Sequence, residues 1–138
     1  AADAVGDSLM EACGEEASRG GRYDTVTCLS VTKWVHLNHG DEGLLKMLRR
    51  IWFLLKEGGM LLLEPQPWRS YHRRRNMSNT TKHHYTTIQI RPENFPQTLR
   101  DNGFQVLETL TPSGNLSKGF NRAIYVCRKG ALAPDATA

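Results

Sequence analysis

The sequence has no long hydrophobic run, few cysteines and no apolar leader. No stretch of its 138 residues approaches the ~20 apolar residues of a membrane-spanning helix. Its three cysteines, Cys13, Cys28 and Cys127, are widely spaced and form no C-x-x-C pair. We therefore expect neither a disulfide framework nor a zinc site, and a reducing, intracellular compartment is favoured. Residues 1–22 carry five acids and no apolar block, so we expect no signal peptide there.

Acidic residues are absent from the segment between Pro65 and Pro92. The same segment holds six Lys or Arg residues and three histidines. Residues 1–64 contain ten acids and seven Lys or Arg, whereas residues 65–138 contain four acids and eleven Lys or Arg. Such a basic region favours a polyanion partner, nucleic acid before an anionic membrane, although a solvated loop without a partner has the same composition. His83 and His84 are adjacent in sequence, and adjacent histidines rarely converge on one ion, so we expect no metal site.

The rest of the composition, 39% hydrophobic and 23% charged, is that of one globular domain. Residues 23–31 are β-branched and mostly apolar, which predicts a buried parallel strand. A connection over residues 32–39 leads to Gly40-Asp41-Glu42, where acids favour the start of a helix. Apolar residues then recur at helical spacing, at Leu44, Leu45, Met47, Leu48, Ile51, Trp52, Leu54 and Leu55.

Glycines 58 and 59 are predicted to end that helix, and residues 60–64 to form a second short strand. The order strand, helix, strand predicts a parallel sheet with a right-handed crossover. The later elements are a partly helical basic loop (69–76), a helix ended by Gly103 (92–102), and two strands (105–110 and 123–128) joined by a polar loop. We predict an α/β domain over residues 23–129, a poorly ordered lead-in over 1–22 and a disordered tail over 130–138.

Polar and aromatic side chains gather where the two predicted parallel strands end. In open α/β sheets, ligands bind beyond the carboxyl ends of such strands. The two groups are Ser30, Thr32, Lys33, Trp34, His36 and Asn38, and then Glu64, Gln66, Trp68, Arg69 and Tyr71. Packing against the sheet would explain at least one of the tryptophans. A surface lysine and a capped loop histidine remain open alternatives for Lys33 and His36.

Two long motifs carry a family resemblance. They are CLSVTKWVHLNHGDEGL, from Cys28 to Leu44, and LEPQPW, from Leu63 to Trp68, and a later SKGF starts at Ser117. Over roughly residues 23–129 the chain resembles the bicoid-interacting-protein family of RNA methyltransferases. The resemblance implies a class I, Rossmann-like methyltransferase fold that uses S-adenosylmethionine (SAM) and ends in an antiparallel strand pair. It also implies methyl transfer to the 5′-terminal phosphate of a small RNA such as a small nuclear RNA, with the nucleus favoured over the cytoplasm and no membrane partner.

The resemblance also assigns residues to roles. It places Leu29 and Ser30 at the methionine end of SAM, and Lys33 and His36 at the reacting phosphate as catalytic residues. The residues that would bind RNA or its phosphate are Lys33, Trp34, Gln66, Arg69, Tyr71, Arg73 and Arg74. Either Trp34 or Tyr71 would stack on the first base, and the basic residues Arg73, Arg74, Arg75 and Lys82 would follow the RNA backbone.

One feature of such enzymes is missing. They hold SAM with a G-x-G loop after the first strand and an acid after the second, but no two of the twelve glycines here are separated by exactly one intervening residue. We therefore expect this chain to be the C-terminal half of the methyltransferase domain, with the N-terminal half of the same domain as a missing partner. The alternatives are a non-catalytic RNA-binding remnant, or an unrelated α/β module whose basic loop contacts acidic protein.

Overall fold

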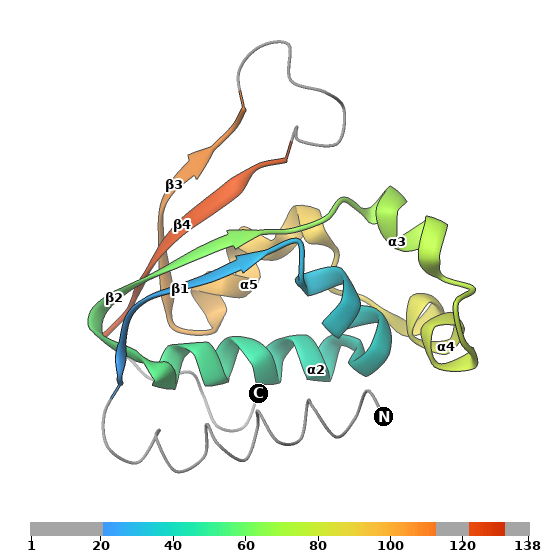
Figure 1. The fold of residues 1–138 in the computed structure, drawn as a ribbon, viewed down its shortest axis with the longest axis horizontal. Coiled ribbons are helices and arrows are strands. Elements are labelled where there is room, and N and C mark those ends of the chain that lie inside the picture. Colours follow the sequence, from blue (N-terminus) through green and yellow to red (C-terminus); the bar gives the residue numbers. More distant parts are fainter. Residues whose placement is uncertain (1–20, 113–121, 132–138) are drawn as a thin grey trace.

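A four-stranded sheet holds the structure together (Figure 1). In the computed structural model, which describes residues 21–112 and 122–131, β1 (Tyr23–Leu29) pairs in parallel with β2 (Leu55–Glu64). The other edge of β2 pairs antiparallel with β4 (Ile124–Lys129), which pairs antiparallel with β3 (Phe104–Leu110). The order β1-β2-β4-β3 confirms the predicted α/β sheet with an antiparallel pair at its end.

Two helices cover one face of this sheet and form the core with it. Helix α2 (Thr32–Leu54) is the crossover from β1 to β2, and α5 (Phe95–Asp101) follows the short 3-10 helix η1 (Pro92–Asn94). The apolar stripe of α2 packs with α5 and with the inward side chains of the strands. The buried core comprises Cys28, Leu44, Leu48, Ile51, Trp52, Leu55, Leu61, Leu63, Phe95, Leu99, Phe104 and Cys127. Cys28 in β1 and Cys127 in β4 are both free and buried, whereas Cys13 lies outside the described residues.

The predicted connection over residues 32–39 is wrong, because this segment is the first part of α2. Its buried residues include Lys33, His36, Leu37 and Gly40, which continue the spacing of the apolar stripe farther along the helix. Gly40 adopts φ 71° and ψ −169°, so α2 is kinked there and a new helical stretch starts at Asp41. The prediction that a helix starts near Gly40 therefore describes only the second part of α2.

Substitution of Gly40 by alanine should lower the free energy of unfolding by about 1–3 kcal/mol, since only glycine tolerates this backbone conformation. An added Cβ would also lie 3.1 Å from the His84 ring. Urea unfolding of Gly40→Ala measures this effect, with the exposed Lys46→Ala on the same helix as the control. Equal stability of the two variants would contradict the strain at the kink.

The prediction that Gly58 and Gly59 end the crossover helix is also wrong. The helix ends at Leu54, and Leu55 already pairs with Tyr23 of β1. The register then moves from Tyr23 opposite Leu55 to Thr25 opposite Met60, so β2 bulges between these two pairs. The glycines are needed in this bulge, where one of them has φ 75°, rather than at a helix terminus.

The basic segment lies beyond the carboxyl ends of β1 and β2 as two short helices (Figure 1). Helix α3 (Trp68–Arg74) confirms the predicted helical turn, and α4 (Asn79–Thr87) was not predicted. Ser78 starts α4, because its Oγ accepts a hydrogen bond from the Thr81 N–H at 3.1 Å while the Thr81 hydroxyl accepts from the Ser78 N–H. Most of the predicted lead-in, most of the polar loop and nearly all of the tail lie outside the described residues, and the domain boundaries stay predictions.

Candidate functional site

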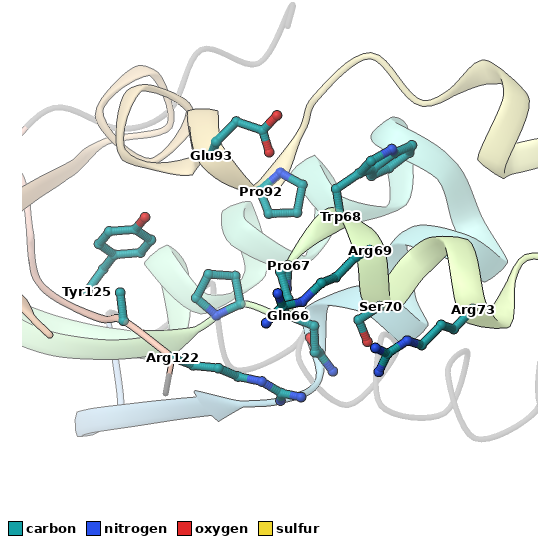
Figure 2. Close-up of a pocket in the computed structure, with 12 residues that line it drawn as sticks. Gln66, Pro67, Trp68, Arg69, Ser70, Arg73, Pro92, Glu93, Arg122 and Tyr125 are labelled. Carbon is teal, nitrogen blue, oxygen red and sulfur yellow. The ribbon is translucent and has the colours of Figure 1, made fainter. Parts of the chain in front are cut away.

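An open pocket of about 770 Å³ lies beyond the carboxyl end of β2. Its lining contains three arginines and a single acid. The lining residues are Pro65, Gln66, Pro67, Trp68, Arg69, Ser70, Arg73, Pro92, Glu93, Arg122, Ala123 and Tyr125. Figure 2 shows the guanidinium groups of Arg69, Arg73 and Arg122 directed into the space between α3 and the end of β2. Three guanidinium groups around one open pocket favour an anionic ligand with several oxygens.

Gln66 joins two elements of the fold beneath this pocket. Its side chain is 2% exposed, and its Nε2 donates to the Ser30 carbonyl oxygen at 2.5 Å. Its Oε1 accepts from the backbone N–H of Lys33 at 3.1 Å and from the Thr32 hydroxyl at 3.3 Å. Gln66 thus fixes the start of α2 to the end of β2. Its Oε1 and one of its two Nε2 N–H groups are occupied by protein groups, so only the second N–H could contact phosphate, and this contact stays a prediction.

Lys33 is a nearly buried cation beside the pocket. It is 7% exposed, its Nζ donates to the Ser70 hydroxyl at 2.9 Å, and its Nζ lies 4.3 Å from the centre of the Trp34 ring. Burial lowers the pKa of Lys33, and the positive charges of Arg74 and Arg122 lower it further. Among the described residues no carboxylate forms an ion pair with it. A buried ammonium group in these surroundings is suited to bind an anion that enters from outside.

Ser30 and Glu64 join the ends of β1 and β2, and Arg122 contacts both. The Ser30 hydroxyl donates to Glu64 Oε1 at 2.6 Å and accepts from Arg122 Nη1 at 2.8 Å, while Arg122 Nη1 lies 3.7 Å from the same carboxylate oxygen. Ser30 has φ 58°, the one positive φ at a non-glycine residue among the described residues. The sequence analysis missed Arg122 as a site residue. The available signal was its position just after the SKGF motif.

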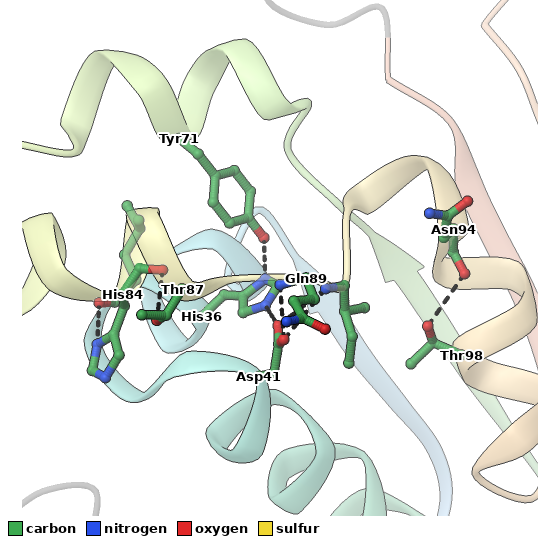
Figure 3. Close-up of polar contacts among 10 residues, drawn as sticks. His36, Asp41, Tyr71, His84, Thr87, Gln89, Asn94 and Thr98 are labelled. Atoms are coloured by element: carbon green, nitrogen blue, oxygen red, sulfur yellow. Dashed lines mark hydrogen bonds and ion pairs between the residues drawn. The ribbon is translucent and has the colours of Figure 1, made fainter.

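His36, predicted to act at the phosphate, is instead fully buried between Asp41 and Tyr71 (Figure 3). Its Nε2 lies 2.7 Å from Asp41 Oδ1 and its Nδ1 lies 2.9 Å from the Tyr71 hydroxyl. Both ring nitrogens are therefore occupied, and the ring is 0% exposed. The Tyr71 ring is also 0% exposed, so it cannot stack on a base, and this predicted role is corrected. Both side chains face inward because they lie on the core side of α2 and α3.

Burial of His36 gives the stability of the protein a pH dependence. Burial lowers the pKa of His36 below its usual 6.5, and Asp41 opposes this shift only in part. The unfolded chain then takes up a proton that the folded chain refuses, so the free energy of unfolding should fall as the pH drops below about 6.5.

The variant His36→Gln should lose this component of the pH dependence, because its side chain does not titrate. Urea unfolding at pH 7.5, 6.5 and 5.5 compares the two proteins. The same dependence on pH in both would show that His36 does not titrate differently on folding.

The remaining predicted site residues are three arginines of α3 and Trp34. Arg69 and Arg73 line the pocket and are exposed, whereas Arg74 is exposed on the same helix outside the lining. Trp34 is 38% exposed at the start of α2, and Lys33 Nζ lies against its ring. The ring of Trp68 is not free to stack on a base, because the Tyr85 ring stacks on it with the ring centres 4.8 Å apart. The Arg91 guanidinium also lies 3.9 Å from the centre of the Trp68 ring.

The residues assigned to SAM by resemblance fit only one wall of such a site. Leu29, at the end of β1, is 49% exposed and offers an apolar surface. The Ser30 hydroxyl is occupied by Glu64 and Arg122, and its carbonyl oxygen is occupied by Gln66. The described residues contain no G-x-G loop that would bind the carboxylate end of SAM. They also contain no strand before β1, and so no acid after such a strand that would bind the ribose. Within the same residues no helix is long and apolar enough to cross a membrane.

Comparison with known proteins gives one family and several relatives. The family model of Bicoid-interacting protein 3 (Bin3) matches residues 23–129. A probable RNA methyltransferase of Arabidopsis thaliana is 52% identical over 110 residues, which cover 78% of this chain and 35% of the relative. The 7SK snRNA methylphosphate capping enzyme of Homo sapiens is 48% identical over 125 residues, which cover 89% of this chain and 17% of the relative.

A solved structure confirms the fold class. The CurJ carbon methyltransferase matches with a TM-score of 0.56 and 19% identity over 81% of this chain and 31% of that chain. At this level of identity the similarity concerns the fold alone. The chain spans no more than about a third of the length of the two curated relatives described above.

Proposed function

The chain belongs to the bicoid-interacting protein 3 family, and on this basis we propose that it supplies the RNA-binding half of a SAM-dependent RNA 5′-phosphate methyltransferase. The observation that carries the proposal is the cationic pocket at the end of β2, which Arg69, Arg73 and Arg122 line and which lies beside the buried Lys33. Two relatives named for methylphosphate capping of 7SK and U6 small nuclear RNA suggest a small RNA as substrate and the nucleus as compartment.

The chemistry places modest demands on these side chains. An RNA phosphate oxygen is already ionised at neutral pH, so it needs no general base, and the protein contributes mainly by positioning and desolvation. Lys33 and Arg69 would hold the terminal phosphate, and Arg73 and Arg122 would bind its remaining oxygens or a neighbouring phosphate. The exposed face of Trp34 would stack on the first base. SAM, when bound, would supply the methyl group.

The SAM site would be completed by polypeptide that pairs with β1. Within the described residues β1 has a neighbour on one side only, so its other edge has free backbone donors and acceptors. A further parallel strand bearing the glycine loop would pair there and bring SAM to Leu29. This N-terminal half of the same domain is the partner that we propose.

The absence of a G-x-G loop favours a second candidate, a non-catalytic RNA-binding remnant. Calorimetric titration with SAM separates the two candidates. The titration is made on this chain together with the N-terminal half of the domain, because the SAM site would be incomplete in this chain alone. Heat of binding would support the enzyme, whereas no heat from SAM or its demethylated product, with RNA binding retained, would favour the remnant.

Both candidates use the cationic pocket, and this pocket is tested by its recognition of the RNA 5′ end. Two RNAs of one sequence, one with a 5′-monophosphate and one with a 5′-hydroxyl, are titrated against the full chain while tryptophan fluorescence is followed. We expect the 5′-phosphorylated RNA to bind at least about tenfold more tightly, the effect of one or two charged hydrogen bonds. Equal dissociation constants would contradict the proposed pocket.

A further inference from the structure

We propose that Asp41, His36 and Tyr71 are positioning residues that hold the two flanks of the cationic pocket in register, although none of the three lines it. The inference rests on the proposed function, because it assigns these residues an effect on phosphate recognition. They form a series of hydrogen bonds that begins at the kink of α2 and ends in α3, in which His36 and Tyr71 are fully buried and Asp41 is partly exposed (Figure 3).

The direction of these hydrogen bonds follows from the chemistry of the three groups. An ionised Asp41 carboxylate can only accept, so the bond at 2.7 Å requires a proton on His36 Nε2. In a neutral imidazole the other nitrogen, Nδ1, is then an acceptor, and the Tyr71 hydroxyl donates to it at 2.9 Å. Burial raises the pKa of Tyr71, so this hydroxyl keeps its proton. One tautomer of His36 therefore satisfies all three side chains.

Each end of this chain holds a different flank of the pocket. Tyr71 lies in α3 between Ser70 and Arg73, which line the pocket. Asp41 Oδ2 accepts from the backbone N–H of Gln89 at 2.9 Å, and Asp41 also accepts from the N–H of Ile90. These residues lead directly into Pro92 and Glu93, which line the opposite side. A change at His36 would therefore move α3 relative to the segment before η1.

The surroundings of His36 support a directional role rather than simple filling of space. Asp41, Tyr71 and His84 are the titratable groups that face it, and the Phe95 ring lies 6.1 Å from its own. Besides the bond from Lys33 to Ser70, the bond from Tyr71 to His36 ties α3 to α2. Apolar contacts at this place would permit sliding, whereas hydrogen bonds of fixed direction define one position of α3.

The sharpest test removes one oxygen atom. Tyr71→Phe keeps the ring and its packing but deletes the donor to His36 Nδ1. The readout is the ratio of the dissociation constants for 5′-hydroxyl and 5′-phosphorylated RNA, with thermal melting to confirm folding. We expect this ratio to fall about three- to tenfold, the equivalent of one hydrogen bond, with binding of the 5′-hydroxyl RNA unchanged.

Tyr85→Phe is the matched control, since its hydroxyl contacts the exposed His72 at 3.2 Å outside the chain of three residues. It should leave the ratio unchanged. An unchanged ratio in Tyr71→Phe, or an equal fall in both variants, would overturn the positioning role while the wild-type ratio still supports the proposed function. A wild-type ratio of one would instead overturn the proposed function and this inference with it.

Asp41→Asn tests the other end with a spectroscopic readout. Its amide oxygen can still accept from Gln89, and its NH₂ group then faces His36 Nε2, so the imidazole proton should move to Nδ1. The ¹⁵N shifts of the His36 ring report this change of tautomer, and the RNA ratio should fall together with it. A tautomer that switches without any fall in the ratio would overturn the inference.

Discussion

Replacement of Lys33 by methionine should weaken the binding of 5′-phosphorylated RNA by about 10- to 100-fold, the range expected for one or two buried charge-assisted hydrogen bonds. The 5′-hydroxyl RNA of the same sequence should bind within about twofold of wild type, since Lys33 is 7% exposed and cannot reach the outer RNA backbone. Fluorescence titrations with the two RNAs at one salt concentration measure both effects.

The same substitution should leave the free energy of unfolding unchanged or raise it. The Lys33 ammonium is buried and lacks a carboxylate partner among the described residues, so its desolvation raises the free energy of the folded state. Methionine fills a similar volume without that penalty, and the interactions lost are the bond to Ser70 and the contact of the ammonium with the Trp34 ring. Loss of phosphate binding together with retained stability would mark Lys33 as a ligand-binding group rather than a structural one.

Lys82→Met is the control for Lys33→Met. Lys82 is exposed on α4 and does not line the pocket. Its loss should weaken both RNAs equally and reduce the slope of log K against log salt by about 0.7, the value for one contact to a single strand. Equal effects of the two methionine substitutions on the two RNAs would refute a special role of Lys33 at the 5′ end.

The fold was predictable where local patterns and tertiary packing agree. The apolar stripe from Leu44 to Trp52 identified the main helix, and β-branched residues identified β1. The start of α2 was missed because its inward positions are taken by polar residues such as Lys33 and His36, which hide the helical period. Their spacing relative to Leu37 and Leu44 was the signal that could have extended the helix toward its N-terminus.

The site was predictable as a location but not as a set of contacts. The rule on strand ends placed Ser30, Gln66 and Arg69 together, and the structure brings them to the ends of β1 and β2. Sequence could not show that Tyr71 points inward, because the short polar helix α3 has no clear apolar face. It also could not place Arg122, which reaches Ser30 across 92 positions of the chain. Such long-range contacts depend on the antiparallel return of β4.

Gln66→Ala should lower the free energy of unfolding by about 2–4 kcal/mol, because it leaves several buried partners unpaired. The Ser30 carbonyl would lose its bond from Gln66 Nε2, and the backbone N–H of Lys33 would lose its acceptor. Gln97→Ala is the matched control, since Gln97 is exposed on α5 and its Nε2 donates to Oδ1 of the likewise exposed Asp101 at 2.8 Å. Its effect should stay within about 0.5 kcal/mol.

The comparison of these two variants decides between two roles of Gln66. If the side chain joins the start of α2 to the end of β2, the free energies of unfolding of the two variants, measured in urea, will differ by at least about 1.5 kcal/mol. A phosphate ligand would behave in the opposite way, because its loss would weaken RNA binding and leave the free energy of unfolding close to that of Gln97→Ala. Gln66→Glu sharpens the distinction further. It keeps the acceptor for Lys33 N–H, loses the donor to Ser30, and places a negative charge under a pocket lined by three arginines, so it should lower phosphate affinity more than Gln66→Ala does.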